Sequence, residues 1–237
     1  MTLTVAERIA GFDAGLGLQP DHPAGQTGEQ ALATILVQEL SGDHLELGRI
    51  VSRWVAVTDR RFGCPVVARS LAELARTGAP PADAAFGPGL GATVVTLAAS
   101  ARLFQTPRNL VSGIYHLARL LDPHPVGAFA AVAAAVAAGR LLEGKRDFVP
   151  EVLDVLLTNE APLELIAEVR RAPVWVRPGA PMGPPEVELG TVFWALHHSG
   201  KASQVLDGIG PLGPLAQVAG RALLGARHGP IPISGVT

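Results

Sequence analysis

The chain has a single cysteine and few aromatic residues. Because Cys64 is the only cysteine, an internal disulfide is excluded, and the composition is compatible with a reducing compartment. Aromatic residues make up 5% of the 237 residues, so the hydrophobic core must be built mainly from aliphatic side chains. The sequence is therefore not that of a small disulfide-stabilised protein.

Charge is also scarce. Charged residues account for 17% of the chain, and the formal net charge is −2, with no cluster of basic residues. A protein that binds nucleic acid or an anionic membrane normally presents a basic patch. We therefore expect no nucleic-acid partner.

No apolar run is long enough to predict a membrane span. The most apolar stretch, residues 126–139, is mostly alanine and falls short of the roughly 20 residues that cross a bilayer. A buried core helix explains it better. The segment 1–17 lacks a cationic region ahead of an apolar run and contains Glu7 and Asp13, unlike a signal peptide. We expect a cytoplasmic protein with no membrane partner.

What the chain does contain is aliphatic and helical. Hydrophobic residues make up 48% of it, which is too many for a disordered protein, and its length allows a substantial core. Apolar residues recur three and four positions apart in segment after segment, and strand-like alternation is nearly absent. The pattern predicts an all-α fold.

Several helix starts can be located from capping motifs. Thr4 with Glu7, and Thr27 with Gln30, have the spacing of capping boxes. Thr106, followed by a proline, has the form of an N-cap with proline at the first helical position. Further helices are predicted over residues 47–55, from Pro65 onward, and over 124–142, 149–157, 163–170, 187–198 and 215–227.

One segment interrupts the helices. Residues 173–185 contain five prolines and two glycines, which forbid a regular helix and predict a fixed, partly extended loop. We place no domain boundary in this loop, and residues 1–237 are interpreted as one domain.

Short blocks of small and polar residues occur along the chain. Residues 8–16 read R-I-A-G-F-D-A-G-L, residues 27–33 read T-G-E-Q-A-L-A, and residues 87–93 read G-P-G-L-G-A-T. Residues 62–65 read F-G-C-P. Near the end, G-P-L-G-P-L starts at Gly210, and G-A-R-H-G closes the following predicted helix. In this order the blocks resemble motifs of the ADP-ribosylglycohydrolase family.

The resemblance implies a helical bundle with a known chemistry. In active relatives the bundle holds two magnesium ions in a central cleft and cleaves the bond between ADP-ribose and a protein side chain. A hard divalent cation takes about six oxygen ligands, so a two-metal site needs several carboxylates.

Most metal-binding positions of the family have lost their oxygen ligands in this chain. Only Glu29 is acidic among the six positions, which are Pro20, Gly28, Glu29, Leu212, Pro214 and Leu215. One carboxylate cannot assemble a two-metal site, so we expect no cofactor and a catalytically inactive protein. We also expect Leu212 and Leu215 to be largely buried against helices of the N-terminal half.

Other readings of these residues remain open. Glu29 lies at a predicted helix start, where an acidic side chain usually complements the helix dipole. The alternative is that Glu29 is a residual metal ligand or a general acid. Asp13, Asp21 and His22 are candidates for a relocated metal cluster with Glu29. Candidate ligand-binding positions are the glycines of the third block, Gly87, Gly89 and Gly91.

Three functions are compatible with the resemblance. The first is a pseudoenzyme that binds an unknown small molecule or protein. The second is an active hydrolase of ADP-ribosyl or related bonds that uses Mg²⁺ in a rebuilt site. The third is a structural or interaction protein whose apolar helix faces pair in a homo-oligomer.

Overall fold

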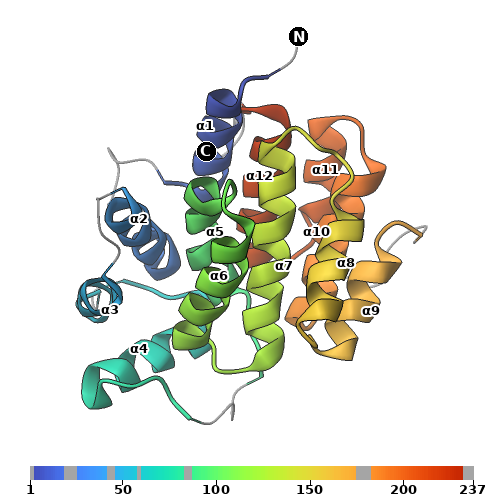
Figure 1. The fold of residues 1–237 in the computed structure, drawn as a ribbon. Helices are drawn as coiled ribbons and strands as arrows, with labels where there is room; N and C mark the ends of the chain where they lie inside the picture. The colour runs from blue at the N-terminus through green and yellow to red at the C-terminus, as the bar shows by residue number, and fades with distance from the viewer. Residues whose placement is uncertain are drawn as a thin grey trace.

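The computed structural model describes residues 3–18, 26–41, 46–57, 60–82, 87–174 and 183–231. These residues contain twelve α-helices and no strand, which confirms the all-α prediction (Figure 1). The helices are α1 (Val5–Leu16), α2 (Gly28–Leu40), α3 (Leu47–Val55), α4 (Pro65–Thr77), α5 (Gly91–Leu103), α6 (Pro107–Leu121), α7 (Pro125–Leu142), α8 (Val149–Thr158), α9 (Leu163–Arg171), α10 (Pro185–His198), α11 (Ala202–Ile209) and α12 (Pro214–His228).

Both predicted capping boxes are formed. The Glu7 N–H donates to the Thr4 hydroxyl at 3.2 Å, and the Thr4 N–H donates to the Glu7 carboxylate at 2.7 Å. At the start of α2 the Gln30 N–H donates to the Thr27 hydroxyl at 3.3 Å, and the Thr27 N–H donates to the Gln30 amide oxygen at 3.0 Å. Both motifs therefore define the helix starts that the sequence predicts.

Thr106 occupies the predicted N-cap position of α6, but it does not cap the helix with its side chain. Its hydroxyl donates to the carbonyl oxygen of Leu103 at 3.0 Å, the last residue of α5. Because only a short turn joins α5 to α6, the hydroxyl closes that turn instead of accepting from the new helix.

Two observed helices, α5 and α11, were not predicted. Helix α5 is buried from Gly91 to Ala101, so it has no polar face and shows no amphipathic stripe. It contacts α2, α6 and α7. Helix α11 has only eight residues, which is too short for a clear periodic pattern.

Helix α7 lies at the centre of the bundle in Figure 1. Within the described residues it is the one helix whose length and composition would also suit a bilayer, but 83% of this 18-residue span is buried inside the protein. Its alanines let α5, α6, α8, α10 and α12 pack against it. The predicted core helix is therefore confirmed.

Helices α1 and α12 meet backbone to backbone. A Cβ atom added at Gly225 would lie 2.0 Å from the carbonyl oxygen of Gly11, and one added at Gly15 would lie 2.4 Å from that of Arg221. Only glycine permits such an approach. The contact joins the first and last described helices side by side (Figure 1).

The proline-rich segment is only partly described. Residues 175–182 of the predicted loop lie outside the described residues. The turn at residues 173 and 174 fits the prediction, but α10 already begins at Pro185. Proline is well tolerated in the first turn of a helix, so the prolines at the end of the segment start α10 rather than extend the loop.

Candidate functional site

Glu29 is fully buried near the start of α2, and its carboxylate reaches the start of α4. One carboxylate oxygen accepts from the Cys64 N–H at 2.7 Å, and the other accepts from the Gly63 N–H at 3.1 Å. Cys64 is the N-cap of α4. The Glu29 carboxylate thus holds the start of α4, whereas its own helix α2 is capped by Thr27 and Gln30.

The position before Glu29 is closed by an aromatic ring. A Cβ atom at Gly28 would lie 2.4 Å from two ring carbons of Phe62. The Gly28 N–H donates to the carbonyl oxygen of Arg61 at 2.8 Å, which holds this loop against α2. An aspartate at this position would collide with the ring unless Phe62 moved.

Leu212 and Leu215, at the turn into α12, differ in how far they are buried. Leu212 is buried, with 4% of its surface exposed, as expected. Leu215 is partly buried and packs against the hydrophobic core. Its side chain lies 3.6 Å from the Cβ position of Gly63, which places it beside the loop that holds Glu29. Pro214 opens α12 and is exposed. We call Gly28, Glu29, Phe62, Gly63 and Leu215 the Glu29 end.

Glu188 was not identified from the sequence. Its carboxylate, on α10, accepts from the Gly213 N–H at 3.1 Å, and Gly213 is the N-cap of α12. Burial raises the pKa of Glu188, and the hydrogen bond from Gly213 partly opposes this shift. Glu188 therefore repeats the arrangement of Glu29, with a carboxylate at the start of another helix.

Two of the candidate ligand-binding glycines pack against Cys64. A Cβ atom at Gly89 would lie 2.5 Å from Cys64 Sγ, and one at Gly91 would lie 2.5 Å from Cys64 Cβ. A Cβ atom at Gly87 would meet nothing within 4 Å. Burial raises the pKa of the Cys64 thiol, which keeps it protonated. Close packing accounts for two of the glycines, and ligand binding by the three stays a prediction.

Asp122 is a second buried carboxylate that the sequence does not reveal. It accepts from the Gly89 N–H at 3.0 Å and from the His124 N–H at 2.9 Å. Burial raises the pKa of Asp122, while these hydrogen bonds and the nearby charges of His124 and Arg119 oppose the shift. The carboxylate anchors the loop before α5 to the end of α6.

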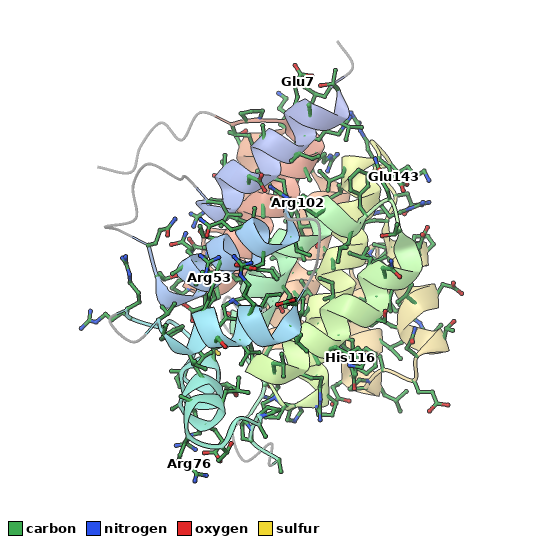
Figure 2. All side chains as sticks on the ribbon, turned by 60° about the vertical axis from the view of Figure 1, so that its left-hand side comes forward. Glu7, Arg53, Arg76, Arg102, His116 and Glu143 are labelled. Atoms are coloured by element: carbon green, nitrogen blue, oxygen red, sulfur yellow. The ribbon has the colours of Figure 1, made fainter. Side chains whose placement is uncertain are left out.

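The described residues do not fit a metal centre. Both oxygens of Glu29 accept from backbone N–H groups. Asp13 forms an ion pair at 3.1 Å with Arg102, which is labelled in Figure 2. Across the described ranges no group of three or more histidine, cysteine, aspartate or glutamate residues is placed to hold a metal ion. Pro20, Asp21 and His22 lie outside the described residues.

Comparison with known proteins bears on the fold. No protein-family model matches the sequence, and no curated protein matches it. A solved chain described as an ADP-ribosylglycohydrolase-related protein complex is similar over 95% of this chain and 88% of its own length, with a TM-score of 0.75 and 18% identity. The protein therefore has the all-α fold of an ADP-ribosylglycohydrolase-related protein, as the sequence motifs imply.

Proposed function

We propose that this protein is a catalytically inactive relative of the ADP-ribosylglycohydrolases with a binding or structural role. The observation that carries the proposal is the environment of Glu29, the one acidic residue among the six degenerate positions. Its two carboxylate oxygens are engaged by the N–H groups of Gly63 and Cys64. A magnesium ion would have to displace both hydrogen bonds to use this carboxylate.

The neighbouring positions supply no replacement ligands. The Phe62 ring covers Gly28, and Leu212 and Leu215 offer only hydrocarbon. Two divalent cations near one carboxylate would lack both oxygen ligands and compensating negative charge. Metal-assisted cleavage of an ADP-ribosyl bond has no support from these side chains.

An activity assay tests the proposal directly. Peptides ADP-ribosylated on arginine or serine are incubated with the purified protein and magnesium chloride, and free ADP-ribose is measured by mass spectrometry. We expect no release above a sample that contains a chelator. Chelator-sensitive release that is lost in Glu29→Gln, but kept in the surface control Glu73→Gln, would establish an active hydrolase with a rebuilt site.

Thermal stability gives a second, independent readout. A protein that folds without metal should melt at the same temperature in magnesium chloride and in sodium chloride of equal ionic strength. A melting temperature raised by several degrees in magnesium alone would contradict the proposal.

A second candidate function is interaction with another protein chain. Leu163 is 78% exposed at the start of α9, and Leu157 is 52% exposed near the end of α8. The similar solved chain is described as part of a complex, which favours the same candidate. Light scattering across a dilution series, with Leu163→Glu as the disrupting variant, tests self-association. A monomer at every concentration would exclude the homo-oligomer.

A further inference from the structure

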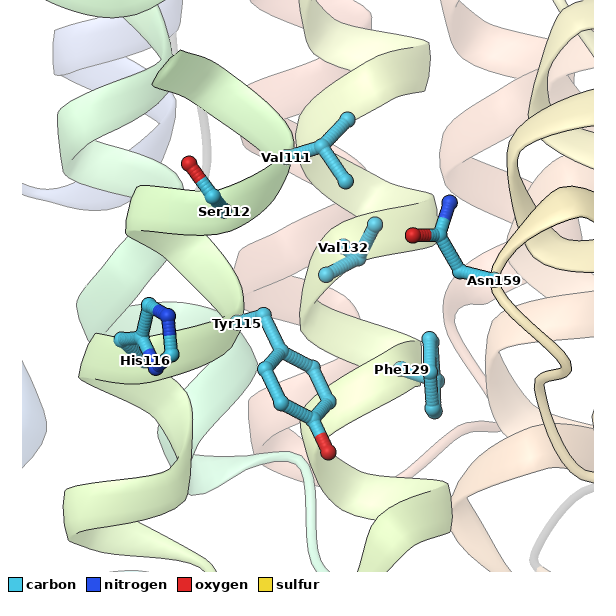
Figure 3. A pocket seen from close by; sticks show the side chains of 7 residues that line it. All are labelled: Val111, Ser112, Tyr115, His116, Phe129, Val132 and Asn159. Carbon is cyan, nitrogen blue, oxygen red and sulfur yellow. The ribbon is translucent and has the colours of Figure 1, made fainter. Parts of the chain in front are cut away.

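A pocket of about 650 Å³ lies between α6, α7 and the end of α8 (Figure 3). None of its lining residues belongs to the Glu29 end. The pocket is lined by Val111, Ser112, Tyr115, His116, Phe129, Val132 and Asn159, which we call the aromatic pocket. Its volume lies in the range of small-molecule sites.

The spacing of the lining residues explains how the pocket forms. Four of them come from α6, at positions that share one face of the helix, and two come from α7, three residues apart. Asn159 is the C-cap of α8 and faces them across the pocket (Figure 3). The three helix segments are held by the core, so the pocket is preformed.

The inner wall is apolar and aromatic. Val132 is fully buried, and the rings of Tyr115 and Phe129 lie 5.0 Å apart at an interplanar angle of 48°. In a chain with 5% aromatic residues, the only tyrosine is found here. Phe129 stays partly exposed, whereas Phe148 and Phe193 are fully buried in the core. The exposed ring area is thus available to a ligand.

The rim is polar but carries no fixed charge. It contains the hydroxyl of Ser112, the ring of His116 and the amide of Asn159, and no lysine, arginine, aspartate or glutamate lines the pocket. The Asn159 side-chain N–H donates to the carbonyl oxygen of Val155 at 2.8 Å, which fixes the amide. The amide oxygen is left as an acceptor on the side of the other lining residues (Figure 3). While His116 is neutral, a charged ligand finds no counter-charge among these residues.

We propose that the aromatic pocket binds an uncharged, planar aromatic molecule that donates a hydrogen bond to Asn159. The aromatic part packs on Tyr115 and Phe129, and the donor reaches the Asn159 amide oxygen. This site does not depend on whether the Glu29 end is catalytic, so its test is separate from the ADP-ribose assay.

Indole is a suitable probe because it is a neutral aromatic molecule with one N–H donor. Titration into the ¹⁵N-labelled protein is followed by two-dimensional NMR. We expect saturable shifts confined to α6, α7 and the end of α8, with a dissociation constant of about 1 mM or tighter for a ligand of this size. Indole-3-carboxylate, which carries a negative charge, should bind at least about tenfold more weakly.

Variants separate pocket binding from a change in the fold. Phe129→Ala should weaken indole binding by about tenfold through the lost ring contact. Ser112→Trp adds bulk at the exposed rim without removing core side chains, and it should abolish the shifts. Leu206→Ala, on the distant helix α11, is the matched surface control and should bind as the parent does.

Three results would overturn the proposal. They are the absence of saturable shifts, shifts that persist in both Phe129→Ala and Ser112→Trp, and equal binding of the charged and neutral probes. Shifts centred on Leu157 and Leu163 that depend on protein concentration would instead identify this face as a contact between protein chains.

Discussion

The Glu29 end and the aromatic pocket differ in whether their polar groups have hydrogen-bond partners within the protein. At the Glu29 end both carboxylate oxygens have backbone donors within 3.1 Å, and the Phe62 ring covers the neighbouring glycine. In the aromatic pocket the Asn159 amide oxygen and the aromatic rings face open space. The first region uses its polar groups to hold the fold, and the second leaves them available for a ligand.

The two regions also differ in their relation to the sequence motifs. All five residues of the Glu29 end lie in blocks that resemble a known family, and the Glu29 carboxylate is engaged by the backbone of another such block. The aromatic pocket carries none of these motifs, yet it has the volume and lining of a binding site. The resemblance therefore directs attention to the Glu29 end and gives no information on the aromatic pocket.

The largest expected effect is at Glu29 itself. Glu29→Ala leaves the N–H groups of Gly63 and Cys64 without their acceptor, and we expect a loss of about 2–4 kcal/mol in the free energy of unfolding. Glu29→Gln keeps one acceptor oxygen and should cost less. Urea denaturation measures both, with Glu73→Ala as the control, because that residue forms only a surface ion pair with Arg76. Equal losses for Glu29→Ala and Glu73→Ala would show that the two hydrogen bonds do not stabilise the fold.

The contact between Gly28 and Phe62 predicts that substitutions at these two positions have non-additive effects on the free energy of unfolding. Gly28→Ala should cost about 1–3 kcal/mol because its Cβ would overlap the Phe62 ring. In a Phe62→Ala background the same change should be neutral or slightly stabilising, since alanine favours a helix more than glycine does. A double-mutant cycle by urea denaturation gives the coupling energy. Additive effects would mean that the ring does not close this position.

A smaller, stabilising effect is expected beside the aromatic pocket. Glu160 has φ of 53° and follows the end of α8, where Ala161 donates to the carbonyl oxygen of Leu156 at 2.9 Å. This left-handed position favours glycine, so Glu160→Gly should raise the unfolding free energy by about 0.5–1 kcal/mol. Indole binding should be unchanged. The same substitution at Glu164, inside α9, should destabilise the protein and serves as the control.

The smallest effect is the pH dependence from Glu188. Burial raises its pKa above the ordinary value of 4.5, so the folded state binds this proton more tightly than the unfolded state. Its contribution to stability is present below pH 4.5 and is lost as the pH rises through the raised pKa. Glu188→Gln does not ionise, so its melting temperature should improve relative to the parent between about pH 4 and pH 7. The exposed variant Glu164→Gln should follow the parent in parallel. A constant difference for Glu188→Gln would contradict the assignment.

The features that the sequence predicts correctly depend on neighbours along the chain. The capping boxes at Thr4 and Thr27 join residues three positions apart, so their hydrogen bonds can be anticipated from spacing alone. The starts of α4 and α12, which have a proline at the first helical position, were located to within one residue. Helix α5 was missed because burial on every side removes the periodic contrast on which the prediction relies.

The two candidate sites were harder to predict because each joins segments that are distant in the sequence. Glu29 is recognisable as the remaining acidic position, but its partners Gly63 and Cys64 lie 34 and 35 positions further along. The bond between Glu188 and Gly213 spans 25 positions and has no local pattern. The aromatic pocket likewise exists only after α6, α7 and α8 come together.

The backbone contact between α1 and α12 has a consequence for how the chain folds. Arg8 donates to the carbonyl oxygen of Ala226 at 3.2 Å, across a sequence separation of 218 residues, and the glycines of both helices allow the backbones to meet. Closing so long a loop has an entropic cost that only later contacts offset. We therefore expect the two helices to pair late in folding, after local contacts around α5 and α7 have formed. During synthesis α1 would be made well before α12, so its glycine-bearing face would have no partner until the intervening helices had been made.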